Sequence, residues 1–275
     1  MYKFNPNFYA DIRIEDRFAT NVLIKNGNLD EAKETTEVKA FIRVFDGKMW
    51  YYTSTVDIDN IQQALDELYG YATPNPDIAN NAIVARYQVN KDVKLRFTDC
   101  SVRNVPLADK IKLVADTGAK LVSPMSNIIN ARYIDRNSLY KFYSSKGADI
   151  TYDFQTAGES YAMGFTKGEE TMYEALSHAL TRFDQLGYTD KQLADFVAEC
   201  ENYITNAKPV TAGSYPVVFA PDVTGVFAHE SFGHKSESDF MLGDETMARE
   251  WQIGKKVGSE LLTIRESGLL DGSGY

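Results

Sequence analysis

Apolar and polar residues alternate along the first fifty residues of the chain. Between Tyr9 and Glu15, the apolar side chains Ala10, Ile12 and Ile14 alternate with charged ones, which is the pattern of a half-buried strand. Two turn signals, Asn26-Gly27 and Asp46-Gly47, follow at hairpin spacing. The pattern predicts an antiparallel meander of four strands, at Tyr9–Glu15, Asn21–Lys25, Lys39–Phe45 and Lys48–Thr53.

Two segments with a helical pattern follow, and then further segments with an alternating pattern. Apolar residues spaced three and four apart predict helices from Ile58 to Leu68 and from Pro106 to Val122. Alternation returns in four further strands, at Ile128–Ile134, Leu139–Ser144, Ile150–Gln155 and Tyr161–Thr166. Because strands followed by helices occur twice, we expect an α+β fold of antiparallel sheets with packed helices.

Other segments carry weaker patterns. We expect strands at Ile83–Gln88, Val93–Phe97 and Leu261–Arg265, and helices at Glu169–Phe183, Thr189–Asn206 and Asp244–Ile253. The Lys208–Ser214 stretch contains Pro and Gly and predicts a boundary between residues 1–207 and residues 208–275. Tyr and Phe are dense in the second meander, where they indicate either ordinary strand packing or a peptide-gripping surface.

The candidate chemistry lies between Val217 and Gly243. A short apolar run reaches Pro221, which is a helix-start signal, and His229, Glu230 and His234 follow. Two imidazoles and a carboxylate are the groups that a zinc site needs for ligands and a general base. The alternative is a helix with two incidental polar histidines.

The spacing of these histidines is unusual. On a regular helix, residues five apart lie about 140° from one another, too far for one metal ion. We therefore expect the helix to bulge or to end between His229 and His234. Gly233 is the residue expected to tolerate that departure, and single-turn π-bulges often occur at functional sites.

Composition narrows the class of protein. The chain has 275 residues, 44% hydrophobic content and a net charge of −10, which are typical of a globular protein and disfavour phosphate-backbone binding. The N-terminus lacks an apolar signal segment, and no run reaches membrane-spanning length. Two cysteines are too few for a disulfide framework. We expect a cytoplasmic protein that binds neither nucleic acid nor membrane.

Several stretches resemble the TldD/PmbA metalloprotease family. The segments Tyr9–Glu15 and Ile24–Glu31 resemble the family's opening hairpin, and Gly213–Phe219 resembles the strand before its active helix. The run from His229 to Asp239 matches the family signature H-E-x-x-G-H-x-x-E-x-D, and Leu270–Tyr275 resembles a segment that leads into a further β-rich region. The resemblance implies that residues 208–275 begin a C-terminal metalloprotease domain.

The resemblance also implies roles for individual residues. His229 and His234 would be zinc ligands and Glu230 the general base, with Glu237 and Asp239 as candidates for orienting a ligand. The third ligand of the family is a cysteine in the C-terminal region, and neither Cys100 nor Cys200 matches it. By this criterion the chain resembles a truncated family member.

Two functions follow as hypotheses. The first is a zinc peptidase of TldD type that hydrolyses extended or unfolded peptides, paired as a homodimer or as a heterodimer with a PmbA/TldE-like subunit. Its substrate would add to an open strand edge at Tyr215–Phe219. The second is an inactive fragment, or a partner- or peptide-binding module of the same fold. We expect His178, the third histidine, to be a helix residue outside any site.

Overall fold

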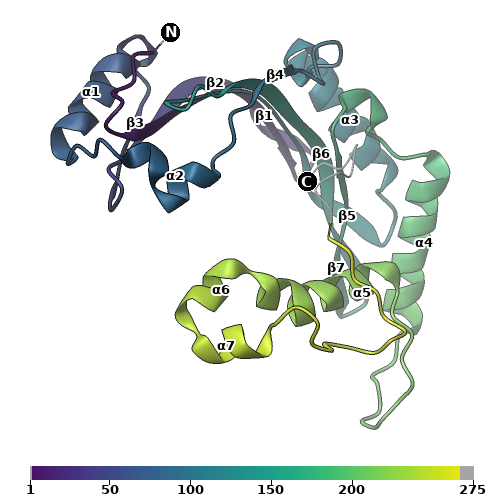
Figure 1. Cartoon of the computed structure of the whole chain (residues 1–275). Coiled ribbons are helices and arrows are strands. Elements are labelled where there is room, and N and C mark those ends of the chain that lie inside the picture. The colour runs from purple at the N-terminus through teal and green to yellow at the C-terminus, as the bar shows by residue number, and fades with distance from the viewer. Residues whose placement is uncertain (1, 267–275) are drawn as a thin grey trace. The chain divides into compact units, whose positions relative to one another are not determined.

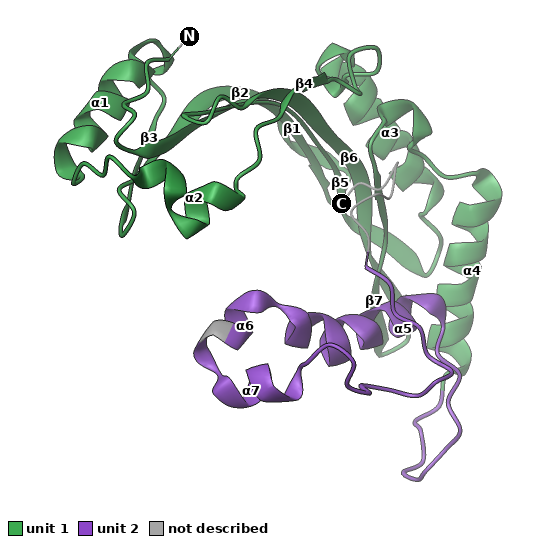
Figure 2. Cartoon of the chain, viewed as in Figure 1, with its two compact units in different colours: residues 1–207, 272–275 green, residues 208–271 purple. Residues whose placement is uncertain are grey.

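The structure is a computed structural model that describes residues 2–266, apart from the side chain of Leu242. Its contacts form two compact units, whose described parts are residues 2–207 and 208–266 (Figure 2). The division falls at the start of the Lys208–Ser214 stretch. The assignment of the units as two domains of 1–207 and 208–275 stays a prediction.

Unit 1 is built on one seven-stranded sheet (Figure 1). The strands run in the order β3-β2-β1-β5-β6-β4, and β7 also pairs with β6. Every pair is antiparallel except β4 with β6. The strands are β1 (Tyr9–Lys25), β2 (Asn28–Phe45), β3 (Trp50–Thr55), β4 (Lys91–Lys94), β5 (Ser126–Ser144), β6 (Asp149–Lys167) and β7 (Glu170–Leu180). The predicted α+β class is confirmed.

The two predicted meanders form a single sheet because β1 pairs with β2 on one side and β5 on the other. The strands are also longer than predicted. Tyr9–Glu15 and Asn21–Lys25 are the two ends of β1, since burial continues to alternate through Phe18, Thr20 and Val22. The predicted turn is confirmed: Asn26 and Gly27 both have positive φ angles, 49° and 77°, as a two-residue hairpin turn requires.

The helices α1, α3 and α4 bury one face of the sheet, and Val84 of α2 packs with Tyr9 and Phe45 on the other. Leu65 of α1 lies in a core with Ile12 and Ile42, while Val114 of α3 and Leu193 of α4 share a second core with Val22, Tyr133 and Tyr161. Thr189 and Gln192 form a capping box at the start of α4. The helices of unit 1 are α1 (Ile61–Tyr71), α2 (Ala82–Arg86), α3 (Leu107–Lys120) and α4 (Asp190–Asn206).

Two predictions for unit 1 are wrong. Glu169–Phe183 contains the strand β7, whose residues pair along β6 from Lys167↔Glu170 to Ala157↔Leu180. Ile83–Gln88 overlaps the short helix α2, whose start is fixed by the side chain of Asn81 accepting a hydrogen bond from the backbone N–H of Ile83. In both segments a local contact or a strand partner overrides the weak apolar pattern.

The regular elements of unit 2 are helices over the residues described. It contains α5 (Pro221–Ala228), α6 (Ser238–Gly243) and α7 (Glu245–Glu250), the last capped by Asp244. Residues 208–266 form no strand, so the predicted strands at Tyr215–Phe219 and Leu261–Arg265 are wrong. A strand needs a hydrogen-bonded neighbour, and none lies beside these segments in the part of unit 2 that the structure describes. The predicted loop at Leu270–Tyr275 lies outside the described residues.

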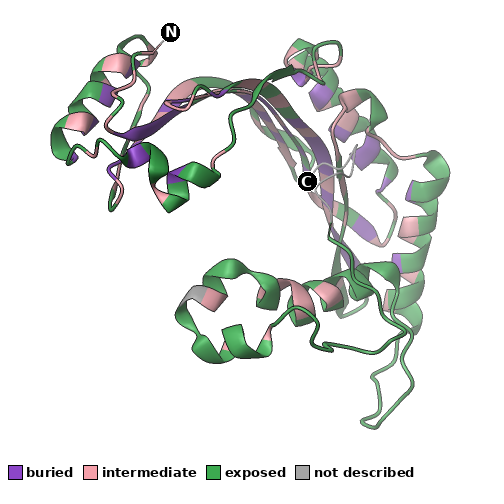
Figure 3. Ribbon diagram, in the orientation of Figure 1, coloured by how far each residue is buried: buried purple, intermediate pink, exposed green. Residues whose placement is uncertain are grey.

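The two units differ in burial (Figure 3). Unit 1 contains the buried hydrophobic residues, whereas no residue between 208 and 266 whose burial is described is buried. Large apolar side chains of unit 2 stay exposed, including Val218 at 98% and Leu261 at 98%. Among the helices of residues 2–266, none is long and apolar enough to cross a membrane.

Candidate metal centre

The candidate site is built on α5 and the helical turns that follow it. Pro221 occupies the first turn of α5, where its missing N–H costs no hydrogen bond. At His229 the helix widens into a π-helical turn, His229–Gly233, in which the N–H of His234 donates to the carbonyl oxygen of His229. The expected bulge between the two histidines is therefore present. A five-residue turn returns residue i+5 to the side of residue i.

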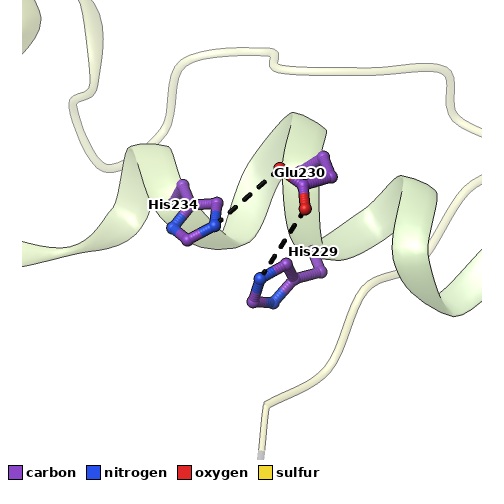
Figure 4. A group of neighbouring side chains, drawn as sticks. All are labelled: His229, Glu230 and His234. Carbon is purple, nitrogen blue, oxygen red and sulfur yellow. Dashed lines mark ion pairs between the residues drawn. The ribbon is translucent and has the colours of Figure 1, made fainter.

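The wider turn brings the three candidate side chains together (Figure 4). The ring centroids of His229 and His234 lie 4.4 Å apart, with 69° between the ring planes. Glu230 reaches both rings, with its carboxylate oxygens 4.0 Å from Nε2 of His229 and 3.8 Å from Nε2 of His234. Possible ligand atoms of the three residues all lie within 4.8 Å of one another. They form the group with metal-ligand spacing in the described part of the chain.

Gly233 has a different role from the one expected. Its φ and ψ angles are −57° and −58°, an ordinary right-handed helical conformation that any residue adopts. A side chain there would begin 3.8 Å from Nδ1 of His229 and 3.9 Å from the carbonyl oxygen of Ala228, which is normal contact. The π-turn therefore does not depend on the backbone freedom of glycine.

Glu237 holds one of the imidazoles. Nδ1 of His234 lies 2.5 Å from Oε1 of Glu237. Because a carboxylate accepts hydrogen bonds, this contact favours the tautomer that carries its proton on Nδ1 and leaves Nε2 to bind a metal ion. Asp239 forms no hydrogen bond or ion pair within residues 2–266. Of the two candidates for orienting a ligand, the contact with His234 is made by Glu237.

Aromatic packing braces the turn from its other side. Phe232, inside the π-turn, packs against Trp251 with ring centroids 5.2 Å apart. The indole N–H of Trp251 donates to Oγ of Ser236 at 3.1 Å, and that hydroxyl donates to the carbonyl oxygen of Phe232 at 2.9 Å. These contacts connect α7 to the residues around His234. The spacing of the motif gave no signal for them.

An apolar cavity of about 600 Å³ adjoins the same helix. Phe227, Ser231 and Phe232 line one side of it, and residues 256–260, Leu262 and Ile264 line the other. All of these residues belong to unit 2. The cavity therefore places a hydrophobic recess within one helical turn of Glu230.

The expectation that His178 is a helix residue is wrong, because it lies on the strand β7. It also has partners. It projects from β7, with Nε2 3.6 Å from a carboxylate oxygen of buried Glu159 and its ring 4.6 Å from that of Tyr188. Tyr161 and the backbone N–H of Gly187 also donate to Glu159. The sequence could not reveal this cluster because the β6–β7 pairing brings His178 opposite Glu159, while Gly187 and Tyr188 come from the segment before α4.

Two family models match the chain. The model described as PmbA/TldA metallopeptidase domain 1 matches residues 10–72, and the model for the PmbA/TldA metallopeptidase C-terminal domain matches residues 212–275. The second match contains the whole group of His229, Glu230 and His234. The chain is a member of the TldD/PmbA family.

Relatives named as metalloproteases are similar in sequence to nearly the whole chain. A zinc metalloprotease TldD homolog from Saccharolobus solfataricus is 26% identical over 275 residues, covering 96% of this chain and 57% of its own length. A metalloprotease from Methanothermobacter thermautotrophicus is also 26% identical, covering 97% and 58%. The chain thus spans less than two thirds of the length of these relatives.

Solved structures share the fold. The TldE protein from Thermococcus kodakarensis has a TM-score of 0.52 at 10% identity, covering 72% of this chain and 44% of its own. A Thermotoga maritima protein described as a modulator of a DNA gyrase has a TM-score of 0.59 at 12% identity, covering 75% and 46%. At these identities the likeness concerns the fold alone.

Proposed function

We propose that this family member is a zinc-dependent peptidase of TldD type in which His229 and His234 bind the metal ion and Glu230 is the general base. The observation that carries the proposal is the π-helical turn, which holds the two imidazole rings 4.4 Å apart. The name of the Saccharolobus relative, a zinc metalloprotease, supports zinc as the metal.

The donor set is chemically suited to zinc. Imidazole nitrogens are common zinc ligands, and a catalytic site adds a third protein ligand and a water molecule. The side chains of His229 and His234 are 62% and 45% exposed, so both rings can turn toward a shared ion. As the resemblance implies, the third ligand would be the family's C-terminal cysteine, which neither Cys100 nor Cys200 matches.

Each residue has a distinct task in the proposed reaction. When bound, zinc supplies Lewis-acid activation of a water molecule. Glu230 would take a proton from a water molecule that attacks a peptide carbonyl, and would pass it to the leaving amine. Glu237 keeps the Nδ1 proton of His234 in place, so that Nε2 stays available as a ligand.

The substrate is proposed to be an extended or unfolded peptide. The recess beside Phe227 and Phe232 would accept an apolar side chain next to the scissile bond. It replaces the strand edge expected at Tyr215–Phe219, where the structure has no strand. The fold shared with TldE suggests a related subunit as the partner, in a homodimer or heterodimer.

The deciding experiment is cleavage of unstructured peptides by the protein made from its complete reading frame. Fluorogenic peptides with a phenylalanine or an alanine beside the scissile bond are compared, with Glu230→Gln as the test variant and His178→Gln as the matched control. We expect cleavage to fall at least 100-fold in Glu230→Gln and to persist in His178→Gln. Undiminished cleavage by Glu230→Gln rules out the role of this carboxylate.

The same assay tests the alternative function. If the complete protein cleaves nothing yet still binds a peptide or a related subunit, it is a binding module of the family fold rather than a peptidase.

A further inference from the structure

A second candidate site lies on unit 1, on the sheet face opposite α1, α3 and α4. Even-numbered residues of β1, such as Ile12 and Val22, point into the cores under these helices. Odd-numbered residues point the other way, and in the middle of β1 this face stays open: the side chain of Arg13 is 53% exposed. The register places Arg13 between Phe41 of β2 and Phe142 of β5.

The open face is hollowed into a groove of about 690 Å³, within the range of about 300–1,000 Å³ typical of ligand sites. Four aromatic side chains belong to its lining. Tyr140 stacks on Tyr152 with ring centroids 5.0 Å apart, Phe142 follows Tyr140 on β5, and Phe41 lies on β2. We call this region the aromatic groove. Tyr152, at 43% exposure, presents its ring to solvent.

Arg13 is the uncommitted cation of this groove. Its guanidinium lies over the ring of Phe142, 5.7 Å from the centroid. Its nearest carboxylate, Asp11, lies 3.7 Å from Nε and is already held by Arg43 through two hydrogen bonds of 3.0 and 2.6 Å. Within residues 2–266, the guanidinium of Arg13 donates no hydrogen bond. An arginine held over an aromatic ring is suited to bind a carboxylate.

Two of the other charged residues of the lining are satisfied internally. The carboxylate of Glu15 accepts hydrogen bonds from Ser138 and Tyr140 and pairs with Arg136 and Lys39. Lys141 pairs in register with Ile14, which places it on the opposite face of the sheet. The groove therefore offers aromatic rings and one guanidinium that donates no hydrogen bond within residues 2–266. The chain as a whole carries a net charge of −10. The attraction of the groove for a negative group is therefore local to Arg13.

Backbone groups of the central strands β1 and β5 cannot take part in recognition here. β1 is paired along both sides, with β2 and β5, and β5 is paired with β1 and β6. A peptide C-terminus is usually captured by free backbone N–H groups, and the floor of the groove has none among these paired strands. Recognition must come from side chains, which favours an acidic side chain over a terminal carboxylate.

We infer that the aromatic groove binds an extended peptide segment in which an aspartate or glutamate lies beside an aromatic residue. The acidic side chain pairs with Arg13 and the aromatic one packs on Tyr152 and Phe142. A single-stranded nucleic acid could also stack on aromatic rings, but it needs several cations along its backbone, and one free arginine in a chain of charge −10 does not provide them. The inference deepens the proposed function by naming a substrate class.

The test measures peptide binding rather than cleavage. The complete protein carrying Glu230→Gln is titrated into a fluorescein-labelled, C-terminally amidated hexapeptide with one aspartate flanked by phenylalanines, and fluorescence anisotropy is recorded. We expect saturable binding that weakens roughly tenfold in Arg13→Gln, the loss of one charge-assisted contact. Tyr152→Ala should weaken it several-fold. Arg17→Gln, a control on the same strand and face but outside the groove lining, should leave binding unchanged.

Matched probes decide between ligand classes. The asparagine version of the peptide should bind the parent protein roughly tenfold more weakly and should be indifferent to Arg13→Gln. Equal binding of both peptides, a requirement for a free C-terminus, or tighter binding of an oligothymidine than of the peptide would each overturn the inference. Because cleavage and zinc play no part in these titrations, their outcome is independent of the proposed peptidase.

Discussion

Lys110 offers a quantitative test of how unit 1 is held together. This lysine is fully buried, and its ammonium group lies 2.9 Å from Asp135, 3.2 Å from Glu34 and 2.7 Å from the hydroxyl of Thr20. Asp135 is also buried, and it accepts further hydrogen bonds from the backbone of Thr20 and the hydroxyl of Tyr133. The cluster joins α3 to β1, β2 and β5.

The Lys110→Met variant keeps the aliphatic stem and removes the charge. Asp135 then stays buried with two hydrogen bonds and no cation, and breaking such a pair costs about 3–5 kcal/mol. With a urea dependence of about 2–3 kcal/mol/M, the unfolding midpoint of unit 1 should fall by about 1–2 M. Adding Asp135→Asn should restore part of the loss, because it removes the stranded charge.

Urea unfolding followed by the fluorescence of Trp50 reports on unit 1 when Trp251 is replaced by phenylalanine. Lys112→Met is the matched control: this lysine is on the same helix, is 71% exposed, and pairs with exposed Asp116, so its loss should cost under about 1 kcal/mol. If Lys110→Met unfolds within about 1 kcal/mol of Lys112→Met, the buried pair does not stabilise unit 1 and the reasoning is refuted.

Three further predictions follow from single residues. Desolvation raises the pKa of Glu15, but hydrogen bonds from Ser138, Tyr140 and Arg136 outweigh this and lower the pKa to about 2 from 4.5. The wild-type protein should therefore be more stable than Glu15→Gln by roughly 3 kcal/mol at pH 6. Urea unfolding at several pH values should show that this difference in stability shrinks between pH 4.5 and 2. Gly233→Ala should change zinc affinity less than about threefold, since φ at this position is −57°; a loss beyond tenfold in a chelator competition would contradict the geometry of the π-turn. Glu237→Ala should weaken zinc binding about 10–100-fold in the same competition, while Asp239→Ala should not, and equal effects would remove the distinction between them.

Local patterns predicted most of the sheet. The alternation around Ile12 and the Asn26-Gly27 turn predict the two ends of β1 and the turn that follows it, because burial on one face and a positive φ both depend on residue type. The alternation could not reveal that β1 joins two meanders, since strand pairing between distant segments leaves no local signal. The segment of β7 was misread as a helix because its apolar residues fit both periods.

The candidate metal centre could be predicted because its residues lie close together in the sequence. His229, Glu230 and His234 are close in sequence, so the awkward spacing itself implied the π-turn that the structure contains. For the aromatic groove, the only signal in the sequence is the density of aromatic residues in the second meander. Its residues come from β1, β2, β3, β5 and β6, and only the register of the sheet places them on one face.

The central claim is that His229 and His234 together bind one zinc ion. The most direct measurement is the zinc stoichiometry and affinity of the complete protein, by elemental analysis and competition with a chromophoric chelator, for wild type, His229→Ala, His234→Ala and His178→Ala. We predict one zinc per chain, an affinity loss of at least about 100-fold for either motif variant, and no change for His178→Ala. A chain that binds no zinc, or binds it equally well without His229 or His234, would contradict the assignment.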